Sequence, residues 1–201
     1  MAMVMTDKVL SEEIWPAEGS ALLVKRVIMV VLGIALLAIA AKIKVPVWPS
    51  PVPVTLGTFA VLTIGAAYGT RLGLVTIFGY MLIGALGFDV FANSTADKAG
   101  LDYMMGSTGG YLVGFVLATL ALGYLARRGW DRNVWKMAGA MLIGNALIYV
   151  PGVLWLGFLY TWDKPILAWG LTPFLVGDAM KLVLAALLLP AVWKLVGSAR
   201  K

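Results

Sequence analysis

The sequence predicts an all-α membrane protein with six transmembrane helices. Its 201 residues are 61% hydrophobic and only 13% charged, whereas a soluble domain usually carries about 25% charged residues. The apolar residues form six runs of roughly membrane-spanning length, and the charged residues gather in the segments between them. The net charge of +6 therefore indicates membrane topology rather than nucleic-acid binding.

The N-terminal segment, residues 1–23, is more polar than the rest and is expected to lie in the cytoplasm, as a short interfacial helix or an irregular tail. The first span is expected at residues 24–41. The residues before it lack the basic start of a signal peptide, so we expect this span to be retained. The membrane domain as a whole is expected at residues 24–196, followed by a cytoplasmic tail at residues 197–201.

A proline-rich connection follows the first span. Four prolines lie between residues 46 and 53, and proline interrupts helices because it lacks a backbone donor and fixes φ. The second span is expected at residues 54–68 and the third at residues 72–90. The Gly-Thr-Arg sequence at residues 69–71 is expected to form the tight turn between them.

The last three spans are expected at residues 108–126, 136–160 and 172–196. A long polar loop at residues 91–107 precedes them, and a basic loop at residues 127–132 separates the fourth span from the fifth. Thr172 and Pro173 open the sixth span, and these residue types suit the N-cap and the first position of a helix.

The distribution of Lys and Arg predicts that both termini are cytoplasmic. With this orientation, eleven of the sixteen basic residues lie inside and four lie outside, while Lys181 falls within the sixth span. Cytoplasmic loops of membrane proteins carry an excess of Lys and Arg. We therefore expect a multi-pass protein whose loop at residues 91–107 faces the outside.

Asp178 and Lys181 are the strongest candidates for a functional site. They lie in the otherwise apolar sixth span, where an ionisable residue costs at least about 2.5–3.5 kcal/mol. Their spacing of three residues places them on one helix face, about 9 Å below the outer end of the span. We interpret them as a site for a polar solute that arrives from outside; the alternative is an internal ion pair that joins two helices.

Further polar candidates lie at the same outer level. Asn93 follows the third span, while Thr108, Gly109 and Tyr111 open the fourth. The N–H groups at a helix N-terminus favour anions and carbonyl oxygens. A plain turn at the glycines is the alternative.

Aromatic side chains near these positions are candidates for an apolar pocket. We assign this role to Phe91 and Trp155, and Phe174 and Tyr149 could join them. Packing between helices is the alternative for each aromatic residue within a span.

The chain contains no Cys and no His, which excludes disulfides, thiolate chemistry and the commonest general base. It also lacks a phosphate-binding loop and the motifs of zinc proteases and serine hydrolases. We therefore expect a transport subunit that is not an enzyme and needs no cofactor or metal. A proton-coupled carrier that uses Asp178 is the alternative, and an intramembrane enzyme or assembly scaffold is a third hypothesis.

Several motifs, in order, resemble the BioY family, the biotin-binding S components of energy-coupling factor importers. They cover residues 24–196 and include Pro-Val-Pro-Val-Thr-Leu at 51–56, Leu-Ile-Gly-Ala-Leu-Gly-Phe at 82–88, Val-Phe-Ala-Asn at 90–93, Thr-Gly-Gly-Tyr-Leu-Val-Gly at 108–114, Gly-Val-Leu-Trp-Leu at 152–156 and Pro-Phe-Leu-Val-Gly-Asp-Ala-Met-Lys at 173–181. Gly57 and Ser107 depart from the family pattern, which often has Gln and Pro there. The first span also lacks the usual spacing of alanines.

The resemblance implies a six-helix S-component fold that captures biotin on the outside of a prokaryotic cytoplasmic membrane. It also implies as partners a transmembrane coupling subunit and a pair of ATPases, and a homo-oligomer is a further assembly that the sequence leaves open. Small residues of the first three spans are the expected docking surface, because they allow close approach of helices. These residues are Ala35, Ala38, Gly65, Gly69 and Gly73.

Overall fold

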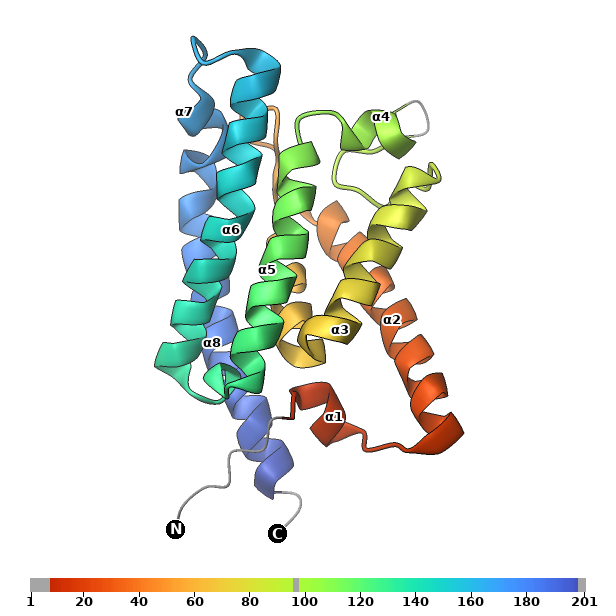
Figure 1. The fold of residues 1–201 in the computed structure, drawn as a ribbon. Coiled ribbons are helices and arrows are strands. Elements are labelled where there is room, and N and C mark those ends of the chain that lie inside the picture. The colour runs from red at the N-terminus through yellow and green to blue at the C-terminus, as the bar shows by residue number, and fades with distance from the viewer. Residues whose placement is uncertain (1–7, 96–97, 199–201) are drawn as a thin grey trace.

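The computed structural model describes residues 8–95 and 98–198 and confirms an all-α membrane fold (Figure 1). Five helical stretches of the described chain are long and apolar enough to cross a bilayer. They contain α2 (Gly19–Lys42), α3 (Gly57–Ala85), α5 (Gly109–Arg127), α6 (Val134–Tyr160) and α8 (Leu175–Ser198). The shorter elements are α1 (Leu10–Ile14), α4 (Gly100–Met104), η1 (Trp130–Arg132), α7 (Ile166–Gly170) and η2 (Thr172–Phe174). Parts of the two predicted terminal segments, residues 1–7 and 199–201, lie outside the described residues.

Helix α3 consists of two segments that fold back on each other at Gly69. This residue has φ 74° and ψ 176°, which are not helical. A Cβ on Gly73 would lie 3.6 Å from Gly65 Cα, although eight residues of a straight helix span about 12 Å. The chain therefore reverses where a turn was predicted, and the predicted count of six spans holds only if the two segments are counted separately.

The proline-rich connection contains a short antiparallel ribbon that was not predicted. Strand β1 (Lys44–Val45) pairs with β2 (Val54–Thr55), with Lys44 opposite Thr55. Two-residue strands carry too little alternation to be recognised in a sequence. The ribbon holds the C-terminal end of α2 beside the start of α3, and both contribute to the pocket described below.

Two helix boundaries differ from the predicted spans. Helix α2 begins at Gly19, five residues before the predicted start, because the intervening apolar residues continue the helix. Helix α3 ends at Ala85 rather than at residue 90. Gly87 follows with φ 97°, a conformation that commonly ends a helix. The loop after α3 consequently begins at residue 86, five residues before the predicted loop.

Glycines allow α5 to pack closely against its neighbours. A Cβ on Gly114 would lie 2.6 Å from Ile148 Cα of α6, and one on Gly123 would lie 2.3 Å from the Thr70 nitrogen of α3. Gly65, Gly69 and Gly73 are likewise buried within the chain. The expectation that these three glycines form a docking surface is therefore wrong, because their contacts are intramolecular.

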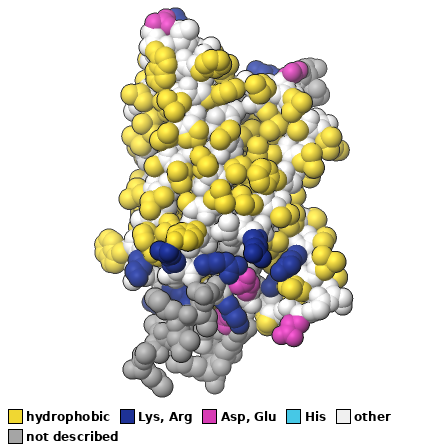
Figure 2. Space-filling view, viewed as in Figure 1, with side chains coloured by type: hydrophobic (Ala, Val, Ile, Leu, Met, Phe, Trp, Pro, Cys, Tyr) yellow, Lys and Arg dark blue, Asp and Glu magenta, His cyan; other side chains and the backbone are white. Residues whose placement is uncertain are grey.

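The surface separates an apolar band from a basic end. Figure 2 shows hydrophobic side chains over most of the visible face and Lys and Arg gathered at one end of it. Helix α1 and the C-terminal end of α8 lie at this end (Figure 1). The described α2 is the most exposed of the long helices, with only 17% of its most apolar stretch buried within the chain, as expected of a helix that faces lipid or a partner.

Candidate ligand-binding site

A pocket opens at the end of the bundle opposite α1. The ends of α2 and of the second segment of α3 meet there with the starts of α3, α5 and α8. The pocket encloses about 670 Å³ of space free of protein atoms, a figure that includes its open mouth. It is lined by Leu37, Ala41, Val52, Pro53, Thr55, Gly57, Thr58, Tyr80, Phe91, Ala92, Tyr103, Thr108, Tyr111, Leu112, Phe115, Tyr149, Phe174 and Lys181.

Lys181 contributes a positive charge to the wall of this pocket. Its side chain comes from the first two turns of α8, and only 9% of the residue is exposed. Its ammonium donates to Asp178 Oδ1 at 2.9 Å and to the Thr58 hydroxyl at 3.0 Å. An ammonium carries three N–H donors, so one donor is left for a bound molecule.

Asp178 lies behind Lys181 and is not among the residues that line the pocket. It is 5% exposed. One carboxylate oxygen accepts from Lys181 and the other accepts from the Tyr149 hydroxyl. A buried carboxylate is stable only when it is paired and hydrogen-bonded, and these contacts satisfy that need. Asp178 thus orients two side chains that do reach the pocket.

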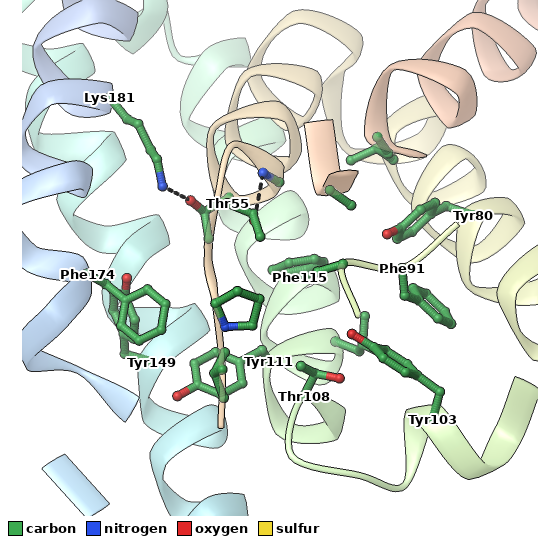
Figure 3. A pocket seen from close by; sticks show the side chains of 18 residues that line it. Thr55, Tyr80, Phe91, Tyr103, Thr108, Tyr111, Phe115, Tyr149, Phe174 and Lys181 are labelled. Carbon is green, nitrogen blue, oxygen red and sulfur yellow. Dashed lines mark hydrogen bonds between the residues drawn. The ribbon is translucent and has the colours of Figure 1, made fainter. Parts of the chain in front are cut away.

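Two groups of aromatic rings form facing walls. Figure 3 shows Tyr149 and Phe174 on the side of Lys181, and Tyr80, Phe91 and Tyr103 on the other side. Phe91 stacks on Tyr103 with ring centroids 5.0 Å apart and meets Tyr80 edge-on at 5.2 Å. Such arrangements are the preferred geometries of aromatic pairs. The two groups of rings form apolar walls of the pocket.

Tyr111 joins the wall near Lys181 and has its hydroxyl already engaged. The hydroxyl donates to the Gly170 carbonyl at 2.7 Å, and the ring meets that of Tyr149 edge-on at 6.3 Å. The tyrosine therefore presents its ring, rather than its hydroxyl, to the pocket.

Thr108 supplies an unsatisfied polar group. Its hydroxyl is buried, lines the pocket and has no hydrogen-bond partner among the described residues. Buried polar groups normally have a partner, and an exception needs an explanation. A ligand atom in the pocket would provide that partner.

The loop that follows α3, at residues 86–95, is tied to the end of α2. Lys42 forms an ion pair with Asp89, and Lys44 donates to Asn93 Oδ1 at 2.8 Å. The hydrogen bond from Lys42 and a second one from Ser94 hold the pKa of Asp89 below its usual value of 3.8. These contacts fix the loop that carries Phe91 into the pocket.

Of the candidate residues from the sequence, the structure brings five together. Lys181, Thr108, Tyr111 and Phe91 line the pocket, and Asp178 contacts Lys181. Tyr149 and Phe174, considered as apolar lining residues, also lie in its wall.

The other three candidates lie outside the lining. Asn93 is exposed and bonded to Lys44. Trp155 donates to the Gly106 carbonyl at 2.8 Å, and Gly109 packs closely against Trp155 and the Met104 carbonyl. The glycine at this helix start is explained by close packing.

Sequence reasoning missed Thr58, Tyr80, Tyr103 and Phe115 as lining residues. Thr58 was detectable in principle, because it is a polar residue in the first turn of a span that follows a proline-rich connection. The three aromatic residues carry no distinguishing local signal.

The chain is similar to proteins of one family. A model of the BioY family matches residues 7–198. A protein of Thermotoga maritima named biotin transporter BioY is 36% identical over 154 residues, which are 77% of this chain and 87% of that protein. A probable biotin transporter BioY of Pyrococcus horikoshii is 35% identical over 164 residues, covering 82% of this chain and 93% of that protein.

A solved structure shares the fold. It is described as the S-component for biotin from an ECF-type ABC transporter, and it superposes with a TM-score of 0.76 over 89% of this chain and 95% of that chain. The two sequences are 19% identical, so this similarity concerns the architecture.

Proposed function

The chain belongs to the BioY family, and we propose that it binds biotin as the substrate-specific transmembrane subunit of an ATP-driven vitamin importer of the energy-coupling factor type. Relatives named as biotin transporters and a fold shared with a biotin S-component support this proposal. The observation in the structure that carries it is a buried ammonium, Lys181, at the wall of a mostly apolar pocket rich in aromatic rings.

Biotin matches the chemistry of this pocket. It has an apolar thioether ring and aliphatic chain, a ureido group with two N–H donors and a carbonyl, and a carboxylate. Mostly apolar pockets with a few placed polar groups suit such molecules. The two aromatic walls would contact the ring system, and Lys181 and Thr108 would contact oxygens or N–H groups of the ligand.

The candidate residues divide into direct and indirect roles. We assign direct contact to Lys181, Thr108, Tyr111 and Phe91, because each lines the pocket. Asp178 is a positioning residue that holds the Lys181 ammonium in place through their hydrogen bond.

In this proposal, three other candidates hold the segments around the pocket without lining it: Asn93, Gly109 and Trp155. Asn93 fastens the loop that carries Phe91. Gly109 and Trp155 hold the chain that leads from α4 into α5, where Thr108 lies.

The proposed orientation places the pocket outside and both termini in the cytoplasm of a prokaryotic cell. It rests on the basic end of the molecule (Figure 2), which the positive-inside rule assigns to the cytoplasm. Biotin would then enter from the outside without crossing the apolar band. Residues 24–196 would form the substrate-binding membrane domain.

A transmembrane coupling subunit and ATPases are the proposed energy source. The chain has no nucleotide-binding motif, and the exposed face of α2, with Leu23, Val27 and Val31, offers an apolar surface to a membrane partner. The alternative, a proton-coupled carrier using Asp178, needs a carboxyl group that exchanges protons. Both oxygens of Asp178 are instead engaged by donors.

Two experiments test this function. Isothermal titration of the detergent-solubilised chain with biotin should give saturable binding, and absence of binding would refute the proposal.

The second experiment measures uptake. In cells without their own biotin uptake, the chain alone should accumulate little labelled biotin, and co-expressed coupling subunit and ATPases should raise accumulation strongly. Full accumulation by the chain alone, abolished by a protonophore, would support the proton-coupled carrier instead.

A further inference from the structure

A second, larger cavity lies at the basic end of the molecule, away from the ligand pocket. It encloses about 1430 Å³ of space free of protein atoms, including its open mouth. Its walls come from α1, the first turns of α2, the reversal in α3 and the end of α5. The ligand pocket and this cavity share no lining residue.

The charge of this cavity is strongly positive. Lys25, Arg26, Arg71 and Arg127 line it, against the single acidic residue Glu12. Arg127 pairs with Glu12 at 2.8 Å, and the Lys25 ammonium donates to the Trp15 carbonyl. The lining therefore carries an excess of three positive charges.

Arg26 and Arg71 provide the uncompensated charge. Neither side chain makes a hydrogen bond or an ion pair with any other residue that the structure describes, and both are exposed. A guanidinium presents its N–H donors as a planar fork that matches the oxygens of a phosphate. Two such groups on the wall of one cavity favour a phosphate ligand.

Part of the remaining wall of the cavity is apolar. Leu22, Leu72 and Val75 line this part, and Val75 is 56% exposed. Basic residues gather at the same level of the molecule, directly beside the hydrophobic side chains (Figure 2). A ligand there would meet positive charge at one end and an apolar wall at the other, which matches a phospholipid better than a free anion.

We propose that this cavity binds an anionic phospholipid, with its phosphate between Arg26 and Arg71 and an acyl chain along Leu22, Leu72 and Val75. Basic pockets between transmembrane helices on the cytoplasmic side suit anionic head groups, and cytoplasmic leaflets carry such lipids. The bound lipid stabilises the contact between α2 and α3, because it bridges residues from these two helices.

The first experiment uses the parent chain in neutral detergent, titrated with phosphatidylglycerol, phosphatidylcholine or inorganic phosphate. Native mass spectrometry should show phosphatidylglycerol bound in preference to phosphatidylcholine, with a higher unfolding temperature. Inorganic phosphate should neither displace the lipid nor reproduce the stabilisation. Equal binding of the two lipids overturns the proposal, and displacement by inorganic phosphate overturns it in favour of a free-anion site.

The second experiment compares two double variants of equal charge. Arg26→Gln with Arg71→Gln should weaken phosphatidylglycerol binding about 30-fold, given the usual contribution of each basic residue near an anionic lipid surface. Lys136→Gln with Lys194→Gln removes two exposed charges that do not line the cavity and should leave binding nearly unchanged. Equal losses in both variants would show non-specific attraction and overturn the site. Biotin binding should persist in both, which separates this proposal from the proposed function.

Discussion

Lys181 Nζ lies 2.9 Å from Asp178 Oδ1, yet only the lysine lines the pocket. The two residues therefore have different roles, although both are buried and charged. The lysine can meet a ligand directly, and the aspartate acts on the ligand through the lysine and Tyr149. This difference leads to the first prediction.

Asp178→Asn and Lys181→Met should each weaken biotin binding by about 30-fold or more. Removing one partner of a buried charged contact typically costs about 2–5 kcal/mol. The double variant should regain thermal stability relative to the single variants, because it leaves neither charge buried without its partner. It should not regain affinity.

Titration calorimetry and thermal unfolding in detergent measure both properties of these variants. Lys194→Met, an exposed lysine at the other end of α8, is the control and should behave like the parent. Parent-like affinity in both folded single variants would mean that the pair only joins helices.

Thr108→Val should lower biotin affinity by up to about tenfold, because a net hydrogen bond contributes about 0.5–1.5 kcal/mol. Stability should be unchanged, since the hydroxyl has no partner among the described residues. Thr119→Val is the matched control: its hydroxyl is also buried without a partner in the described structure, but it does not line the pocket. Equal affinities of the two variants would exclude a ligand contact at Thr108.

Gly114→Ala should destabilise the bundle by about 1–3 kcal/mol, because the added Cβ would lie 2.6 Å from Ile148 Cα and force α5 away from α6. Gly197→Ala is the control. A Cβ there meets nothing within 4 Å, so this variant should be neutral or slightly more stable. Thermal unfolding in detergent compares them, and a neutral Gly114→Ala would contradict the close packing of these helices.

Asp131 should make stability depend on pH at the basic end of the molecule. The residue is fully buried, and Trp193 Nε1 donates to its Oδ2 at 2.6 Å. Burial raises the pKa of Asp131 from 3.8 to about 6, although the hydrogen bond from Trp193 opposes this change. The folded state then binds the proton more tightly than the unfolded chain.

Stability from this group is consequently greatest below pH 3.8 and falls as pH rises to about 6. The total change is on the order of 3 kcal/mol. Asp131→Asn should remove this dependence and be more stable than the parent at neutral pH. Thermal unfolding between pH 4 and 8, compared between parent and variant, measures it. Parallel curves for the two proteins would contradict the raised pKa.

Cysteine labelling tests the proposed orientation, because the chain has no native cysteine. Lys98 lies between α3 and α4, Arg128 lies at the basic end, and both are exposed. In intact cells, Lys98→Cys should react with an impermeant reagent and Arg128→Cys should react only after permeabilisation. The reverse pattern would place the ligand pocket on the cytoplasmic side.

Some residues of the site could be predicted from the sequence, and others could not. Asp178 and Lys181 stood out because a charge within an apolar span is expensive, and their spacing of three residues fixes a common helix face. Trp155 and Asn93 had equally suggestive positions along the chain. Their side chains are used instead to hold Gly106 and Lys44, and no local pattern distinguishes these two uses.

The sequence by itself determined the spans, the basic end and the buried charged pair, because each depends on local composition: the length of an apolar run, the charges that flank it, and the pitch of one helix. The tertiary structure alone decided what surrounds that pair. Thr58 reaches Lys181 across 123 positions of the chain, and Tyr149 reaches Asp178 across 29. The membrane helices are apolar on nearly every side, so hydrophobic periodicity does not reveal which face meets which neighbour. That choice depends on close approach at glycines such as Gly114 and Gly123, and only the packed bundle expresses it.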